Sequence, residues 1–242
     1  MSTPRILTVP TPIKWAQTAA DLIIEQARLA FQARSSWSFV LSGGSTPKPV
    51  YLALAARKEQ IDWAKTYIFW GDERCVPPDD PDSNYRTARE AFLDQIPIPA
   101  QNIFRILGEI SPQAAAQDYQ GTLDAHFYKT ERRFDTLLLG LGEDGHTASL
   151  FPGTPALAEN KKLVVPNTNP HNNTDRVTLT YPAINSARSI IFLVSGENKA
   201  AIVADVIQNP TSPPDYPAKK VTGTDSAPIW VLDQAAASRL NT

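Results

Sequence analysis

A short apolar strand that ends in a glycine-rich, charged loop constrains the fold of this chain more than any other feature. The run Thr-Leu-Leu-Leu at residues 136–139 has the length of a strand buried on both faces. Gly140, Gly142 and Gly145 follow it, spaced around two carboxylates and a histidine. In open α/β sheets, ligands bind at the carboxyl ends of such strands. The pattern therefore predicts an α/β sheet with a ligand site in loop 140–153.

Two side chains of this loop are candidates for chemistry. Asp144 and His146 project from glycine-rich backbone, which can turn sharply or approach a ligand because it carries no Cβ. A single histidine is more often structural than catalytic. One that follows a buried strand and is flanked by acids favours a functional role, because histidine titrates closest to neutral pH.

Alternating strand and helix patterns extend the α/β prediction along the chain. Further strands are predicted at residues 6–9, 37–41, 66–70, 163–166, 176–180, 189–194 and 229–232, with a weaker one at 103–106. Helices are predicted around residues 20–31, 47–56, 84–93, 112–127 and 195–207 and at the alanine-rich C-terminus, with loops at 71–74, 167–175 and 209–220. We expect one domain, residues 1–242, with a doubly wound, mostly parallel sheet and helices on both faces.

The turn after the second strand is a candidate anion site. Residues 42–47 read Ser-Gly-Gly-Ser-Thr-Pro, so that Thr46 is a plausible N-cap and Pro47 a plausible first helical residue. A glycine turn at a helix N-terminus directs free backbone N–H groups at one point, which suits a phosphate. An ordinary capped turn explains the same residues equally well, so both interpretations stay open at this point.

Three cations stand in unusual places. Arg74 follows the strand at 66–70, in a charged turn that could also be solvated or internally ion-paired. Arg176 lies on the polar face of the alternating strand 176–180, so that face is not simple core. Lys199 falls in the first turn of a predicted helix, where a cation opposes the helix dipole unless an anion is bound there.

Composition excludes several classes of function. The net charge of −2 gives no general attraction to nucleic acid. No apolar stretch approaches the roughly 20 residues that span a bilayer, and the first residues lack the apolar segment of a signal peptide, so we expect a cytoplasmic protein without a membrane partner. Cys75 is the only cysteine, which excludes an intrachain disulfide and a cysteine zinc cluster.

Six ordered motifs give the chain a resemblance to the 6-phosphogluconolactonases, within the larger family that includes glucosamine-6-phosphate deaminases. These motifs are residues 42–47, 71–77, 83–84, 140–152, 176–180 and 196–199. The deaminases look similar in the first glycine loop and around the Asp-Gly-His of 144–146. They typically carry Asp-Glu-Tyr where this chain has Asp-Glu-Arg at 72–74, so Arg74 favours the lactonase.

The resemblance implies hydrolysis of 6-phosphogluconolactone to 6-phosphogluconate in the pentose phosphate pathway, with no metal and no cofactor. It implies that His146 activates water while Arg74 faces the sugar-acid end. Asp144 and Asp72 are both candidates for orienting His146 or contacting sugar hydroxyls. The residues that the resemblance assigns to the 6-phosphate are Gly43, Gly44, Ser45, Thr46, Arg176 and Lys199. We expect a monomer or a small homo-oligomer.

Three alternatives remain beside this prediction. Ser149 as a nucleophile is disfavoured, because nothing resembles a Gly-x-Ser-x-Gly elbow. An amino-sugar phosphate deaminase or isomerase is the first alternative function. A non-catalytic sugar-phosphate sensor is the second, although sensors on related folds usually carry a fused helix-turn-helix, for which the first 40 residues leave no room.

Overall fold

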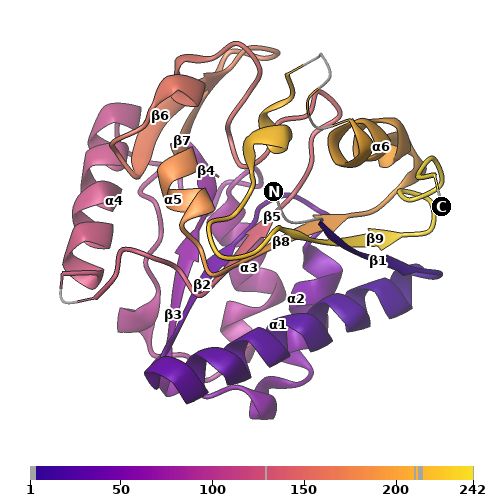
Figure 1. The fold of residues 1–242 in the computed structure, drawn as a ribbon. Helices are drawn as coiled ribbons and strands as arrows, with labels where there is room; N and C mark the ends of the chain where they lie inside the picture. The colour runs from indigo at the N-terminus through magenta and orange to yellow at the C-terminus, as the bar shows by residue number, and fades with distance from the viewer. Residues whose placement is uncertain (1–3, 129, 210, 212–214, 242) are drawn as a thin grey trace.

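The computed structural model describes residues 4–128, 130–209, 211 and 215–241, and these are built around a six-stranded parallel sheet (Figure 1). In spatial order the strands are β1 (Arg5–Val9), β9 (Ile229–Asp233), β8 (Ser189–Val194), β5 (Thr136–Leu139), β2 (Trp37–Leu41) and β3 (Thr66–Trp70). Every residue of β8, β5 and β2 is buried, as expected for parallel strands covered on both faces. The predicted doubly wound α/β class is confirmed.

Helices cover the two faces of this sheet. Figure 1 shows α1 and α2 below the sheet and α6 above it. The α-helices are α1 (Pro12–Arg34), α2 (Lys48–Ala55), α3 (Asn84–Ala91), α4 (Pro112–His126), α5 (Tyr181–Asn185) and α6 (Ala200–Gln208). Ser83 caps α3 and Ser111 caps α4, because each side chain accepts a hydrogen bond from the backbone N–H three residues on.

A second, antiparallel sheet corrects two predictions. It consists of β4 (Asp72–Arg74), β7 (Thr174–Leu179) and β6 (Val164–Asn169), and it lies beside α4 (Figure 1). Residues 72–74, 167–169 and 174–175, predicted to be loop, therefore belong to strands, whereas residues 170–173 form a turn as predicted. The prediction failed because these strands are polar, and β4 finds its partner β7 only about a hundred residues further along the chain.

Three smaller predictions are also wrong. Residues 103–106 make only a single bridge, between Ile103 and Ile68, and are not a strand. Lys199, expected in the first turn of the helix that follows β8, instead ends the 3-10 turn Glu197–Lys199 just before α6. The alanine-rich C-terminus, predicted to be a helix, forms turns at residues 234–239, although the Asp233 carboxylate accepts the N–H of Ala236 at 2.7 Å as a helix N-cap would. Of the predicted loop 209–220, residues 210 and 212–214 lie outside the described residues, and Pro217–Lys220 form a 3-10 turn.

Within the described part of the chain, no helix has the length and apolar character needed to cross a membrane.

Candidate active site

The loops that follow four adjacent strands meet at one edge of the parallel sheet. From β2 the chain passes to β3 on one side and later returns to β5 on the other, which makes this edge a topological switch point. A cavity of about 400 Å³ opens there. Most of the predicted site residues line it: Gly43, Gly44, Thr46, Asp72, Arg74, His146, Arg176 and Lys199. The two others lie beside it, since Ser45 is exposed on a neighbouring groove and Asp144 contacts His146.

His146 and Asp144 form a close pair in the loop after β5. Nδ1 of His146 lies 2.5 Å from Oδ1 of Asp144, and the imidazole ring packs against Phe151 at a centroid distance of 4.8 Å. The pair requires Gly142, because a Cβ there would lie 2.0 Å from His146 Nδ1 and 2.6 Å from Asp144 Oδ1. The glycine spacing of this loop thus has a direct steric cause.

A second histidine binds the same carboxylate. Nε2 of His171, in the turn between β6 and β7, lies 3.0 Å from Oδ2 of Asp144. Burial alone would raise the pKa of Asp144. The hydrogen bonds from His146 and His171, together with the charge of His146, outweigh burial and hold the pKa of this carboxyl below its ordinary range. Asp144 is therefore an ionised acceptor at neutral pH.

This arrangement decides which nitrogen of His146 is free. A carboxylate only accepts hydrogen bonds, so Nδ1 of His146 carries the hydrogen that Asp144 accepts. In the neutral ring, Nε2 then has no hydrogen and keeps its lone pair. Nε2 has no hydrogen-bond partner among the described residues. His146 can therefore take a proton from a group in the cavity.

Asp72 has different contacts from Asp144. Its Oδ2 accepts a hydrogen bond from the Ser149 hydroxyl at 2.6 Å, and the Asn84 amide lies 3.4 Å from its Oδ1. Asp72 makes no contact with His146 in the described structure. The geometry therefore separates the two carboxylates that the sequence left equivalent: Asp144 orients His146, and Asp72 faces the cavity beside Ser149.

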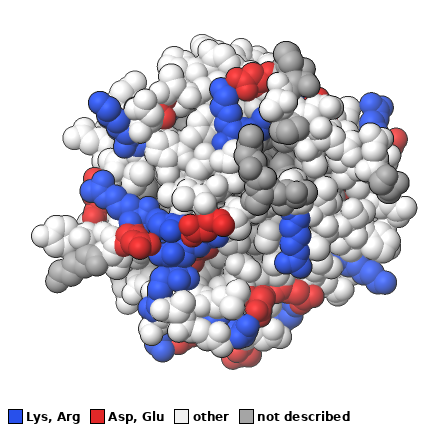
Figure 2. Space-filling model, viewed as in Figure 1, with Lys and Arg blue, Asp and Glu red and all other residues white. Residues whose placement is uncertain are grey.

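Three cations line the cavity without a carboxylate partner among the described residues. Arg74 and Arg176 are register partners across β4 and β7, and each guanidinium donates to a backbone carbonyl, of Asp82 and Asp175 respectively. Burial, and then the charge of Arg74, lower the pKa of Arg176. Figure 2 shows charges of both signs interleaved over one face of the molecule. The cavity differs from that surface because its three cations outnumber its one carboxylate, Asp72, and this excess of positive charge suits an anionic ligand.

The first glycine loop adds free backbone donors to these cations. The N–H groups of residues 43–46 have no hydrogen-bond partner in the described structure. The prediction that Thr46 caps α2 is wrong: the helix begins at Lys48, Pro47 is its N-cap, and no side chain caps it. The chain enters the helix later because Lys48 N bonds Ser45 O at 3.3 Å. Thr46, which lines the cavity, is thereby left free to contact a ligand.

Glu73 is a buried carboxyl that the sequence analysis passed over. It accepts hydrogen bonds from the backbone N–H groups of Arg74, Asn84 and Tyr85, and so ties β4 to the start of α3. Burial raises the pKa of Glu73 to about 6, although these hydrogen bonds oppose the shift. The pKa of Glu73 therefore differs between the folded and the unfolded chain, and the stability of the fold depends on pH through this group.

This raised pKa predicts a pH-dependent stability difference between the wild type and Glu73→Gln. The folded protein holds a proton on Glu73 between the ordinary pKa of 4.5 and about 6, whereas the unfolded chain does not. Stability from this group is present below that window and lost above it. Relative to E73Q, the wild type should lose about 2 kcal/mol of unfolding free energy between about pH 4 and about pH 7. Urea melts across this range measure it, and a constant difference would contradict the assignment.

Two residues of the site were missed from the sequence. Asn84 was given no role beyond its place in one of the six motifs, but its side chain lines the cavity. His171 was placed in a surface loop, and its side chain is indeed 66% exposed, yet it reaches Asp144. For Asn84 the signal was its place in a family motif. For His171 there was none, because the contact depends on how the β6–β7 hairpin folds over the site.

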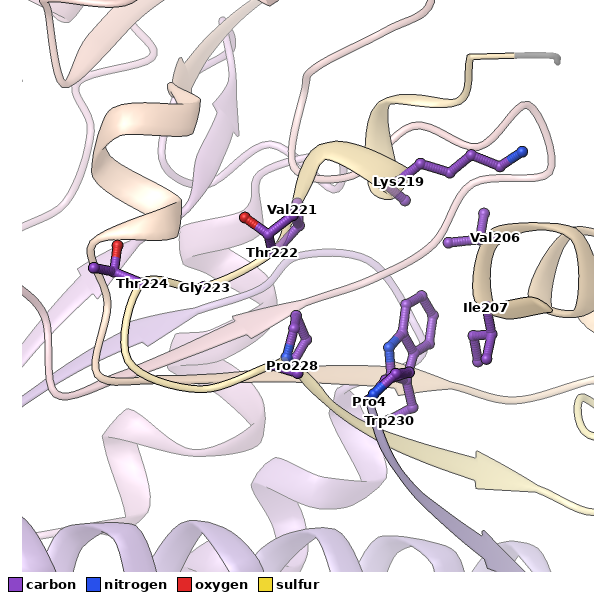
Figure 3. Close-up of a pocket in the computed structure, with 12 residues that line it drawn as sticks. Pro4, Val206, Ile207, Lys219, Val221, Thr222, Gly223, Thr224, Pro228 and Trp230 are labelled. Atoms are coloured by element: carbon purple, nitrogen blue, oxygen red, sulfur yellow. The ribbon is translucent and has the colours of Figure 1, made fainter. Parts of the chain in front are cut away.

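A second hollow, of about 520 Å³, lies near the β1–β9 edge (Figure 3). Trp230 and Ile207 line it, and Figure 3 shows their side chains close together beside Pro4. Its lysine, Lys219, lies 3.6 Å from the carboxylate of Asp205. No predicted site residue lines this hollow, so the chemical groups gather in the cavity at the carboxyl edge of the sheet.

Comparisons with known proteins agree with this architecture. The model of the family "Glucosamine-6-phosphate isomerases/6-phosphogluconolactonase" matches residues 10–230. The 6-phosphogluconolactonase of Nostoc sp. is 41% identical over 91% of this chain and 92% of its own length; that of Synechocystis sp. is 43% identical over 87% and 88%. The structure of 6-phosphogluconolactonase from Trypanosoma cruzi superposes with a TM-score of 0.87 at 30% identity, covering 100% of this chain and 99% of the other. The chain therefore belongs to the glucosamine-6-phosphate isomerase/6-phosphogluconolactonase family.

Proposed function

We propose that this protein hydrolyses 6-phosphogluconolactone to 6-phosphogluconate, a step of the pentose phosphate pathway. The observation that supports the proposal is that one cavity holds both a set of anion-binding groups and a histidine–carboxylate pair. Unpaired cations and free backbone N–H groups suit a phosphate, and a histidine held by a carboxylate suits activation of water. The relatives named 6-phosphogluconolactonase, which match nearly the whole chain, support the same activity.

In the proposed reaction His146 is the general base. Nε2 removes a proton from a water molecule as the water attacks the lactone carbonyl carbon, and Asp144 stabilises the imidazolium that forms. The ring C–O bond then breaks, and the protonated His146 gives its proton to the alkoxide that leaves. A lactone is an activated ester, so these groups suffice without a covalent intermediate.

The cations have two roles in this proposal. Arg176, Lys199 and the N–H groups of residues 43–46 bind the 6-phosphate, while Arg74 stabilises the negative charge that develops on the carbonyl oxygen. The resemblance assigned Arg74 and Arg176 to opposite ends of the substrate. Because the two are register partners, the lactone must lie across the β4–β7 pair.

The contacts of Ser149 favour water as the nucleophile. The side chain is 1% exposed, and its hydroxyl donates to Asp72 instead of His146. The histidine that activates the serine in a catalytic triad is therefore not a partner of Ser149 in the described structure. Ser149 is better explained as the group that orients Asp72.

Acid release from freshly prepared 6-phosphogluconolactone tests the proposed function. The rate with purified protein, corrected for spontaneous hydrolysis, should greatly exceed the rate with unphosphorylated gluconolactone at equal concentration. Ammonia release from glucosamine 6-phosphate should be absent. Ammonia release without lactone hydrolysis would favour the deaminase, and binding of both sugar phosphates without turnover would favour a sensor.

The contact between His171 and Asp144 leads to a prediction about positioning. His171→Ala should lower kcat/KM by roughly 2- to 10-fold, because Asp144 loses one of the two histidine side chains that donate to it, a contact typically worth about 1 kcal/mol. His171→Gln should recover part of the loss, since its amide can still donate. Both variants should melt like the wild type, because the His171 side chain is largely exposed.

Thr168→Ala is the matched control for this pair. Thr168 lies in the same hairpin and makes an exposed side-chain contact with Asp175 that does not involve Asp144. Equal activity of T168A and H171A would show that disturbing the hairpin, and not losing the Asp144 contact, causes the effect.

A further inference from the structure

Asn84, the first residue of α3, carries a buried oxygen without a hydrogen-bond partner. The residue is 2% exposed and lines the cavity, and no described group donates to its Oδ1. Such an acceptor costs free energy unless a donor reaches it, so native proteins rarely keep one without cause. A ligand in the cavity is a donor that can satisfy it.

The orientation of this amide is fixed by its other end. Nδ2 of Asn84 donates to the backbone carbonyl of Asp72 at 2.9 Å. Turning the amide over would place Oδ1 against that carbonyl oxygen, and two acceptors cannot form a hydrogen bond. Asn84 therefore presents an acceptor, and not a donor, away from Asp72.

The free oxygen lies against the first glycine loop. A Cβ at Gly43 would be only 1.9 Å from Asn84 Oδ1, so the amide occupies the space that the missing side chain leaves. The Asp72 carboxylate is the neighbouring acceptor on this part of the wall, and its Oδ2 is already taken by Ser149. Asn84 and Asp72 thus contribute side-chain acceptors beside the N–H donors of the glycine loop, whereas the arginine and Lys199 side chains can only donate.

We propose that Asn84 Oδ1 accepts a hydrogen bond from a ring hydroxyl of the sugar lactone, which makes Asn84 a specificity-determining residue. The inference rests on the proposed function. The phosphate, the ring oxygen and the carbonyl oxygen of the substrate only accept hydrogen bonds at neutral pH. Its hydroxyl groups are the donors that match Asn84. In this proposal the cations bind the phosphate, and the Asn84 amide binds a hydroxyl group of the sugar.

The test compares Asn84→Ala with Asn102→Ala. Asn102 is a matched control because it is also buried, at 7% exposure, and its Nδ2 also donates to a backbone carbonyl, that of Ala64 at 3.2 Å, but it does not line the cavity. N84A should lower kcat/KM for 6-phosphogluconolactone by roughly 5- to 100-fold. N102A should stay within about twofold of the wild type, although thermal melts should show some loss of stability in both. If N84A fails to fold, N84S replaces it.

The 2-, 3- and 4-deoxy analogues of the lactone identify the partner hydroxyl. For one of them the wild type should lose about the same factor that N84A loses on the parent lactone, and N84A should cause no further loss. The proposal is overturned if N84A and N102A are equally active on the parent, or if N84A remains equally harmful on all three analogues. A wild type that does not hydrolyse the parent lactone would instead overturn the proposed function.

Discussion

Replacing His146 with alanine is expected to lower turnover of 6-phosphogluconolactone by roughly 10²- to 10⁴-fold, the usual contribution of a general base. The side chain is 32% exposed, and its ring contacts only Asp144 and Phe151 among the interactions described above. The fold and the affinity for 6-phosphogluconate should therefore change little. Stopped-flow or indicator assays with the spontaneous rate subtracted measure the effect.

Added imidazole provides the control for this variant. If H146A lacks only a base, imidazole should accelerate its reaction beyond the effect of imidazole on the free lactone. A variant with turnover within a few-fold of the wild type would remove His146 from the mechanism. In that case Asp72, the other carboxylate at the cavity, becomes the next candidate base.

Arg176→Ala and Lys199→Ala should each weaken substrate binding by roughly 10- to 150-fold, because a charge-assisted contact to phosphate contributes about 1.5–3 kcal/mol. Turnover at saturation should fall much less, since the reacting carbonyl lies at the other end of the sugar. Initial rates over a range of substrate concentration separate KM from kcat.

Unphosphorylated gluconolactone distinguishes phosphate recognition from a general disturbance. Its slow hydrolysis should be nearly insensitive to either substitution. Arg132→Ala, which removes an exposed arginine paired with Asp124, should leave both substrates unaffected. If the two variants lose activity equally on the phosphorylated and unphosphorylated lactones, neither residue binds the phosphate.

The parallel sheet could be predicted from the sequence because each of its central strands is buried along its whole length. An unbroken apolar run such as β8 is a strong local signal, and the glycine turns that follow β2 and β5 mark where ligand groups emerge. Strands in a parallel sheet end at a common edge, which explains why loops far apart in the sequence supply one cavity. The roles of these residues in catalysis stay predictions.

Strands β6 and β7 overlap the strands predicted at 163–166 and 176–180, but their pairing with β4 and two of the site residues could not be predicted, because those signals are not local. β4 is three charged residues, and only its pairing with β7 makes it a strand. His171 belongs to an exposed polar turn, where nothing in the sequence indicates a partner 27 residues earlier. Asn84 directly follows the N-cap Ser83, where a polar residue is ordinary at a helix start and does not by itself indicate a ligand site.

The register of β4 and β7 has a consequence for the protein without substrate. Arg74 and Arg176 face each other across two neighbouring strands, and like charges in such positions destabilise the pairing. A bound dianion supplies the missing countercharge, so ligand binding and the stability of the small sheet are thermodynamically linked. Amide hydrogen exchange in β4 and β7 should therefore slow when 6-phosphogluconate binds, more than exchange in the main sheet. A constant exchange rate in β4 and β7 with and without 6-phosphogluconate would show that the two arginines are not coupled to the ligand.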